Sequence, residues 1–409
     1  MNSTLFTVHA GWLIDGSGAP ARKDRLLTIR DGRFQAVDDL SAPRAPNHID
    51  LSGCTVFPAL VDSHVHLVMS GTLDPVARKA QLESTYSGRR ETIARHLRDH
   101  FHCGVLAVRD GGDNNGDSLR YRQEVADHDA SLRVAIASPG RARRAAGRYG
   151  KLIAIPVEAG TRLVESAFAS LDDTRRNHLK LVNSGLNSLT QFGMETPSQF
   201  DAASLSEVVS AARRHGQPVM VHANGVQPVK MAVEAGCSSI EHGFFMGRDN
   251  MRRMADTGVV WIPTAVTMKA YSDYLKRQGH RSDPSFAEIS RRNLDHQLEQ
   301  IAAARELGVI LAVGTDAGSP GVHHGHSLKE EIQLFMAAGY GLEGAICCAS
   351  RNGARLMGLD DRGEIAAGMR ADFLAVAAPP QELIDAWGRF SCRVVAGERI
   401  DGPEREPVD

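Results

Sequence analysis

Two histidines separated by one residue are the first candidates for chemistry. His64 and His66 end a run at residues 55–66 that is rich in β-branched and apolar residues, and we expect it to form a strand. Successive side chains of a strand point to opposite faces, so the two imidazoles would point the same way. Two imidazoles on one face can bind one metal ion, although such a pair alone is a weak signal.

Three more potential ligands stand at the ends of later predicted strands. They are His222, His242 and Asp316, each just before a glycine-containing loop. Side chains at the carboxyl ends of separate strands converge only when the sheet closes into a barrel. The pattern therefore predicts a metal site, in which Asp316 could both bind the metal and accept the proton of a bound water.

Lys180 ends another predicted strand, at residues 178–183. A lysine at this place could be an ordinary ion-pair partner. Beside two cations, however, its amine would be driven toward the neutral form. A neutral amine can add carbon dioxide to form a carbamate, whose two oxygens could bridge two metal ions.

The elements that must position these residues alternate between strand and helix about every twenty residues, which predicts repeated βα units. A helix is expected from a capping box at Ser204 and Glu207, and another follows a similar box at Ser327 and Glu330. Further helices are expected at 226–235, 249–256 and 286–307. The eight predicted strands are 55–66, 104–110, 132–137, 178–183, 218–222, 239–242, 259–263 and 309–316. Eight such strands would close an α/β (β/α)8 TIM barrel.

The two ends of the chain have a different pattern. Residues 26–37 contain two β-rich runs around Asp31-Gly32, which predicts a hairpin, and residues 371–376 and 392–396 have the same character. We expect both termini to form one small β-sandwich. The predicted domains are therefore a composite sandwich of residues 1–56 and 362–409, and a barrel domain of residues 57–361.

Composition excludes several classes of function. The chain has 409 residues with 47 Lys and Arg against 49 Asp and Glu, a net charge of −2, which argues against nucleic acid as a partner. Its basic run at 141–148 is expected to be a solvated loop. No signal-like start and no apolar run of membrane-spanning length are present, so no membrane partner is expected. Six scattered cysteines without a CxxC pair fit small buried hydrophobes in a reduced, cytoplasmic protein.

Taken together, the motifs resemble the amidohydrolase superfamily, in particular its imidazolonepropionase-like and prolidase-like branch. The resemblance covers nearly the whole chain. It rests on IDG at 14–16, DG at 31–32, PALVDSHVH at 58–66, VRD at 108–110, Lys180, VHA at 221–223, IEHG at 240–243, PT at 263–264, GTD at 314–316, GEI at 363–365 and GMRAD at 368–372.

This resemblance implies a TIM barrel with an attached β-sandwich and two zinc ions per chain. One ion would be held by His64, His66 and Asp316, and the other by His222 and His242. Carboxylated Lys180 would bridge them. A hydroxide between the metals would attack a carbonyl, while Asp316 would accept its proton and pass it to the leaving nitrogen.

Two other readings stay open. Deaminases of the superfamily commonly use one metal and carry a glutamate three residues after the fifth-strand histidine, where this chain has Gly225. A mononuclear cyclic-amide hydrolase of the imidazolonepropionase kind lacks the bridging lysine. A non-catalytic relative would lose ligands, whereas all six are present here. The sequence thus favours a binuclear amide hydrolase.

The expected reaction is hydrolysis of an amide C–N bond in a small-molecule substrate. A dipeptide of the Xaa-Pro or Xaa-Arg/Lys type, or an N-acyl amino acid, fits best. Arg109 could bind a substrate carboxylate or pair with Asp110. Tyr149 could bind a carboxylate or the oxyanion, and His324 could help to select the substrate. We also expect a homo-oligomer.

Overall fold

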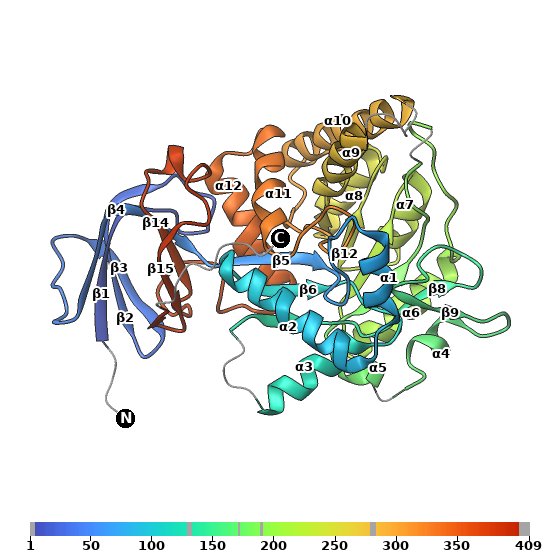
Figure 1. Cartoon of the computed structure of the whole chain (residues 1–409), viewed down its shortest axis with the longest axis horizontal. Helices are drawn as coiled ribbons and strands as arrows, with labels where there is room; N and C mark the ends of the chain where they lie inside the picture. Colours follow the sequence, from blue (N-terminus) through green and yellow to red (C-terminus); the bar gives the residue numbers. More distant parts are fainter. Residues whose placement is uncertain (1–4, 129–132, 171, 189–190, 279–283, 401–409) are drawn as a thin grey trace.

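Strands from both ends of the chain form one sheet in the computed structural model, which describes residues 5–128, 133–170, 172–188, 191–278 and 284–400. The expected hairpin is confirmed: β2 and β3 pair around Asp31 and Gly32, whose φ angles of 49° and 79° suit a tight turn. The sheet has the order β16-β15-β14-β4-β1-β2-β3 (Figure 1). Its strands are β1 (Leu5–Leu13), β2 (Arg22–Arg30), β3 (Arg33–Asp39), β4 (His48–Pro58), β14 (Phe373–Val376), β15 (Phe390–Val395) and β16 (Glu398–Arg399).

The strands from both chain ends form one hydrogen-bonded sheet, the terminal sheet, where we expected a small β-sandwich. β4 pairs with β1 on one side and with β14 on the other, so one hydrogen-bonded ladder joins the two chain ends. The sheet then bends over its own apolar core. Phe34 in β3 contacts Phe373 in β14, with ring centroids 6.0 Å apart.

The middle of the chain contains two parallel sheets, as the βα pattern predicted. Every residue of β5 and β6 is buried, as is typical of parallel strands covered on both faces. One sheet has the order β5-β6-β7, and its strands are β5 (Leu60–Val65), β6 (Val105–Asp110) and β7 (Ala135–Ala137). The other has the order β13-β12-β11-β10-β8-β9, with β13 (Val260–Ile262), β12 (Ser239–His242), β11 (Val219–Ala223), β10 (Leu179–Val182), β8 (Ala142–Ala145) and β9 (Ala154–Val157).

The predicted strand at 309–316 is not a regular strand. Val313 N donates to the carbonyl of Cys348 instead of to a neighbouring strand, and Asp316 has a φ of 59°, which interrupts the ladder. The segment still lies between the two sheets. Trp261 N in β13 donates to Ile310 O at 2.9 Å, and Asp316 N donates to His64 O at 2.7 Å.

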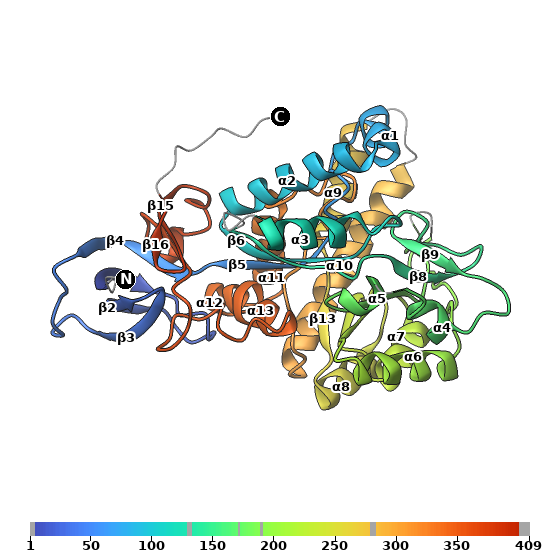
Figure 2. The ribbon, with the colours of Figure 1, turned by 90° about the horizontal axis from the view of Figure 1, so that it is seen from below.

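Helices cover the parallel strands from outside. Figure 2 shows α2 (Tyr86–His102) and α3 (Asp117–His128) on one side of the strands and α6 (Ala202–Arg214) and α7 (Val226–Glu234) on the other. The predicted helices at 226–235, 249–256 and 286–307 correspond to α7, α8 and α10. The remaining α-helices are α1 (Pro75–Glu83), α4 (Leu163–Ala167), α5 (Asp172–Arg175), α8 (Arg248–Thr257), α9 (Val266–Gln278), α10 (Pro284–Glu306), α11 (His326–Ala337), α12 (Leu342–Cys347) and α13 (Gly353–Leu356).

Both predicted capping boxes were placed too late in the chain. The cap of α6 is Asp201, whose carboxylate accepts from Ser204 N at 2.7 Å. α11 begins after Gly325, and Ser327 lies inside its first turn, where its hydroxyl accepts from His323 N. A serine near a helix start can thus satisfy a different donor from the one the capping box assigns to it.

Only the end of the basic run at 141–148 is an exposed turn, at residues 146–148, and the rest is not a solvated loop. Arg143 and Arg144 belong to β8 and are buried, and Arg143 forms an ion pair with Asp173 at 2.9 Å. Among the cysteines, Cys103 is half-buried and the other five are buried, and none of the six forms a disulfide within the described residues. Within the described residues, no helix has both the length and the apolar character needed to cross a bilayer.

One residue separates the terminal sheet from the parallel sheets. β4 ends at Pro58 and β5 begins at Leu60. On one side of this junction Ala59 N donates to Asp372 O at 3.1 Å, and on the other Leu60 N donates to Gly104 O at 3.0 Å. Phe57 at the end of β4 also belongs to the large apolar core that packs around the parallel strands.

Candidate metal centre

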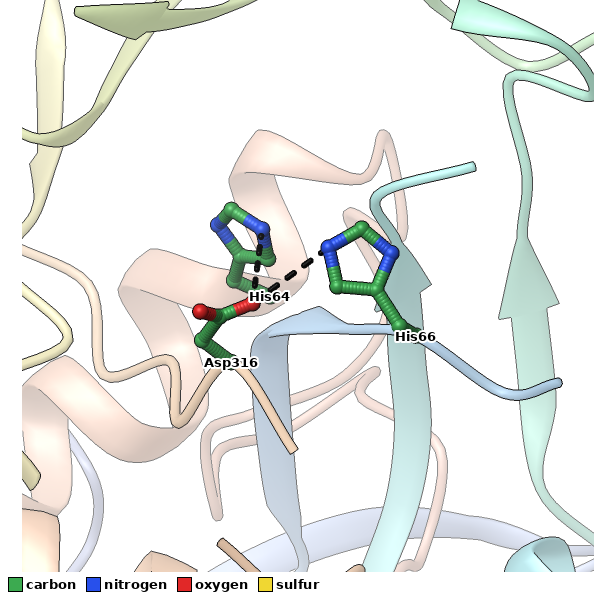
Figure 3. Close-up of side chains that lie close together, drawn as sticks. All are labelled: His64, His66 and Asp316. Atoms are coloured by element: carbon green, nitrogen blue, oxygen red, sulfur yellow. Dashed lines mark ion pairs between the residues drawn. The ribbon is translucent and has the colours of Figure 1, made fainter. Parts of the chain in front are cut away.

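His64, His66 and Asp316 lie within reach of one ion. Asp316 Oδ1 is 3.5 Å from His64 Nε2 and 3.3 Å from His66 Nε2, and the three side chains converge in Figure 3. Their candidate ligand atoms all lie within 4.8 Å of one another. β5 carries His64 and the next residues carry His66, while the 310–316 segment beside β5 carries Asp316. This cluster is the one that the sequence pattern predicted.

His222 and His242 lie beside the same cluster on adjacent strands. His242 ends β12 and pairs in register with Ala223 of β11, next to His222. The ring centroid of His242 is 5.0 Å from that of His64 and 4.6 Å from that of His222. The structure therefore brings together all four imidazoles and Asp316, which lie up to 252 residues apart along the chain.

Each imidazole is oriented by one of its two nitrogens, and the other nitrogen is left for a ligand. His64 Nδ1 donates to Glu241 at 2.7 Å, and His66 Nδ1 donates to the carbonyl of Gly112 at 2.9 Å. His242 Nδ1 lies 2.7 Å from the hydroxyl of Thr264. In His64 and His66 the Nε2 atom faces Asp316 Oδ1, at 3.5 and 3.3 Å.

His222 has the opposite arrangement. Its Nε2 donates to the carbonyl of Gly185 at 3.1 Å, so Nδ1 is the nitrogen left for a metal. Sequence reasoning assigned no role to the orienting residues Glu241 and Thr264. The signal was present, because Glu241 belongs to the IEHG motif at 240–243 and Thr264 to the PT motif at 263–264.

Burial keeps three of the four rings neutral near pH 7, whereas in His66 the effect of burial is outweighed by the hydrogen bond and charge of Asp316, which raise its pKa. Desolvation lowers the pKa of His64 to about 4 and that of His242 to about 3, and it holds the pKa of His222 well below its ordinary value. A neutral imidazole has the free lone pair that a metal ligand requires. The site is therefore ready for a cation at neutral pH without first releasing protons from these three rings.

Lys180 lies among these side chains on β10. It is 1% exposed, and its amine has no hydrogen-bond partner among the described residues. Burial lowers the pKa of Lys180 to about 8, against the opposing charge of Glu241. An orphaned and readily neutralised amine in a fully buried site is unusual, because buried polar groups are nearly always paired.

The backbone at Gly111 leaves space against the first cluster. A Cβ added to Gly111 would lie 2.9 Å from His66 Nε2 and 3.0 Å from His64 Nε2. The Nε2 atoms of His64 and His66 thus face a space that any side chain at residue 111 would fill. His242, Thr264 and Asp316 also have positive φ angles of 68°, 48° and 59°, the kind of local strain that clusters at functional sites.

Arg109 does not lie where a substrate could reach it. Its side chain is 1% exposed and forms an ion pair with Glu241 at 3.1 Å and a hydrogen bond with Ser239 at 3.0 Å. It does not pair with Asp110, whose carboxylate accepts the backbone N–H groups of Leu67 and Gly112. Arg109 instead holds the carboxylate that orients His64.

His324 is also placed away from the metal ligands. It is 3% exposed, stacks on His96 with ring centroids 3.9 Å apart, and uses both nitrogens. Its Nε2 donates to Met69 O at 2.8 Å, and its Nδ1 lies 3.2 Å from His100 Nε2. The ring is a buried packing element against α2, which leaves it no free group for a substrate.

Tyr149 alone of the three predicted substrate residues lies at the site. It is 39% exposed, and its ring centroid is 5.3 Å from that of His222. Gln199 fixes this loop, because its amide donates to Tyr149 O at 3.1 Å and accepts from Ala145 N at 3.0 Å. The ring of Tyr149 therefore lies beside His222, one of the candidate ligands.

Four imidazoles, a carboxylate and a lysine thus meet at the ends of the parallel strands. Such a set of side chains is typical of metal-dependent hydrolases. The chain belongs to the amidohydrolase family, whose signature matches residues 55–397. It is 27% identical over 375 residues to an uncharacterised Mycobacterium tuberculosis protein, with 90% of each chain covered. It is 23% identical over 398 residues to the imidazolonepropionase of Salinispora arenicola, with 92% of this chain and 93% of the relative covered.

A solved structure of a Xaa-Pro dipeptidase with bound methionine has the same fold. The TM-score is 0.81 at 24% identity, with 98% of this chain and 100% of the other covered. These likenesses confirm the predicted superfamily branch and a hydrolase that acts on carbon–nitrogen bonds.

Proposed function

We propose that the protein is a binuclear zinc hydrolase of a dipeptide, of the Xaa-Pro or Xaa-Arg/Lys type, or of an N-acyl amino acid. In this proposal residues 57–361 form a closed (β/α)8 barrel that carries the site. Residues 1–56 and 362–409 form the attached domain. The hydrogen bonds that place residues 310–316 between β13 and β5 support closure of the barrel.

The observation that carries the proposal is the unpartnered amine of Lys180. Its carbamate would supply two oxygens between the His64–His66–Asp316 cluster and the His222–His242 pair. It would also replace an unpaired buried donor with a charged ligand. Histidine and carboxylate donors with open positions suit zinc, which would act as a Lewis acid and lower the pKa of bound water.

Asp316 is the residue proposed to move the proton. Its Oδ2 accepts from Ser319 Oγ at 2.9 Å, which fixes the carboxylate, while Oδ1 faces His64 and His66. Burial alone would raise the pKa of Asp316, but the hydrogen bond of His66 and the nearby imidazole charges lower it. Asp316 would accept a proton from the attacking water and return it to the nitrogen as the C–N bond breaks.

Tyr149 would bind the developing oxyanion or the substrate carboxylate. Desolvation raises the pKa of its phenol, and the charge of Asp316 adds to this, so the hydroxyl stays a donor at neutral pH. The likeness to a Xaa-Pro dipeptidase supports a dipeptide as substrate.

The test is metal content per chain, measured by elemental analysis on protein produced with zinc and bicarbonate. We expect close to two ions in the wild type and fewer in Lys180→Ala, with Lys230→Ala on the outer face of α7 as the matched control. Asp316→Asn should keep much of the metal and lose turnover by several orders of magnitude. An active Asp316→Asn protein would contradict the mechanism.

Ring opening of a cyclic amide is the second candidate, because imidazolonepropionases are among the similar proteins. One ion per chain, unchanged in Lys180→Ala, would favour it.

A deaminase is less well supported. At Gly225 a side chain would meet the carboxylate of Glu195, and that carboxylate already accepts from Val226 N at the start of α7.

A further inference from the structure

Arg78 on α1 connects two loops, one that follows His66 and one that follows Asp316. One terminal nitrogen of its guanidinium donates to Ser70 O and to Gly318 O, each at 2.8 Å. The other lies 3.8 Å from the sulfur of Met69. Ser70 stands four residues after His66, and Gly318 stands two residues after Asp316, so this cation touches both ligand-bearing loops.

Arg78 has no carboxylate partner among the described residues. Its contacts are two neutral carbonyls and a thioether, none of which carries a compensating negative charge. Burial lowers the pKa of the half-buried Arg78, while the charge of Asp316 acts in the opposite direction. A guanidinium that is partly removed from water and unpaired is one that an anion would stabilise.

The side chain also lines a cavity. This cavity has a volume of about 430 Å³ and is lined by Pro75, Arg78, Lys79, Leu82, Glu83, Asn114 and Leu152. Lys79 pairs with Glu83 at 3.8 Å, so Arg78 is the cation in the cavity without a counter-charge.

The cavity is lined by residues that follow two neighbouring strands, β5 and β6. α1 follows β5 and Asn114 follows β6, so both belong to loops at the carboxyl ends of strands, where barrel enzymes bind substrates. Gly318 is two residues from Asp316, a chain distance of at most about 7 Å. A small amide held at the metal ligands could therefore place a second functional group on Arg78.

We propose that Arg78 binds a carboxylate of the substrate, which makes it a specificity residue of the hydrolase. The inference rests on the proposed function for the reaction itself. Because one terminal nitrogen is occupied by the two carbonyls, Nε and the other terminal nitrogen remain to form a bidentate pair with a planar carboxylate. The apolar side chains of Leu82 and Leu152 would contact the part of the substrate next to that carboxylate.

The experiment compares acids with their carboxamides. The pairs are Gly-L-Pro with its terminal amide and N-acetyl-L-leucine with N-acetyl-L-leucinamide, tested on wild type, Arg78→Gln, Arg78→Lys and Lys230→Gln. Gln keeps a donor for Gly318 but removes the charge, Lys keeps the charge, and Lys230→Gln is a control that removes a charge on α7, outside the cavity.

For Arg78→Gln we expect kcat/KM of the acid to fall about 10- to 100-fold, mainly through KM, as loss of a charged hydrogen-bonded pair implies. The carboxamide should change less than about twofold, and Arg78→Lys should recover part of the loss. Lys230→Gln should behave as wild type. Equal losses for acid and carboxamide would mean that Arg78 only ties the two loops together, and would overturn the inference.

A binding measurement separates this inference from the proposed function. If wild type hydrolyses none of the four compounds, the Xaa-Pro and N-acyl amino acid forms of the proposed reaction fail, but calorimetric titration of the zinc-treated protein with the same pairs still tests Arg78. Tighter binding of the acid that disappears in Arg78→Gln supports the carboxylate site. Equal binding of acid and carboxamide by wild type refutes it.

Discussion

Replacing Glu241 with Gln tests the buried charge network beneath the metal ligands. Glu241 is fully buried and its two oxygens accept three hydrogen bonds: Oε2 from His64, and Oε1 from Arg109 and from Ser239 at 2.6 Å. The charge of Arg109 overcomes the effect of burial and lowers the pKa of Glu241, so the native group is ionised. Gln has the same shape, but one oxygen becomes an NH2 group. Whichever way the amide is turned, a donor then faces the N–H of either His64 or Arg109.

Two separate effects should follow. Arg109, 1% exposed, loses its counter-charge, and breaking a buried pair in this way costs about 3–5 kcal/mol of unfolding free energy. His64 also loses its charged orienting partner, which typically weakens metal binding about 10- to 100-fold. The first effect belongs to the fold and the second to the metal site, so they can be measured independently.

Urea unfolding of the chelator-treated protein measures the first effect, and competition with a chelator of known zinc affinity measures the second. The double variant Arg109→Met/Glu241→Gln removes the stranded charge, so it should regain much of the stability but not the zinc affinity. Glu234→Gln, at an exposed ion pair with Lys230, is the control and should change stability by less than about 1 kcal/mol. A Glu241→Gln protein with wild-type stability and zinc affinity would refute the reasoning.

Three further predictions follow from the site and its surroundings. Gly111→Ala should lose zinc from the first cluster without global unfolding, since its Cβ would enter the space facing His64 and His66; zinc content and circular dichroism check this. Thr264→Val removes the group that orients His242 and should weaken binding of one ion about 10- to 100-fold in the same chelator competition. Burial lowers the pKa of His324 to about 4, so the unfolded chain binds a proton first as the pH falls below 6.5, and stability is lost between pH 6.5 and 4. His324→Phe should therefore lose about 2 kcal/mol less unfolding free energy between pH 7 and pH 5 than wild type; an unchanged slope would contradict this.

The convergence of the candidate metal ligands could be predicted because their signal is local. Each histidine ends or directly follows a short apolar run, and the period of a strand fixes the direction in which its ring points. The βα pattern then brings the strand ends together, so the placement of His222 beside His242 followed from residues within single segments. The same reasoning located β2 and β3 from the turn at Asp31.

The failed predictions depend on partners that are distant in sequence. Arg109 was read beside its neighbour Asp110, but its partner is Glu241, 132 residues away. His324 precedes a helix as a capping or loop residue would, and only the packing of α2 shows that it stacks on His96. The segment before Asp316 has the composition of a strand, yet the competing hydrogen bond from Val313 to Cys348 lies outside any local pattern. Tertiary contacts of this kind cannot be obtained from spacing.

The single residue between β4 and β5 has a consequence for motion. Domains that open and close around a substrate need a few residues that can absorb large changes in φ and ψ. Here Ala59 is bonded to Asp372 and Leu60 to Gly104, so the chain offers no such hinge next to the strand that carries His64. The terminal sheet and the strands of the metal site should move as one rigid body. Entry of substrate and exit of product then depend on α1 and on the loops that follow the strands of the site.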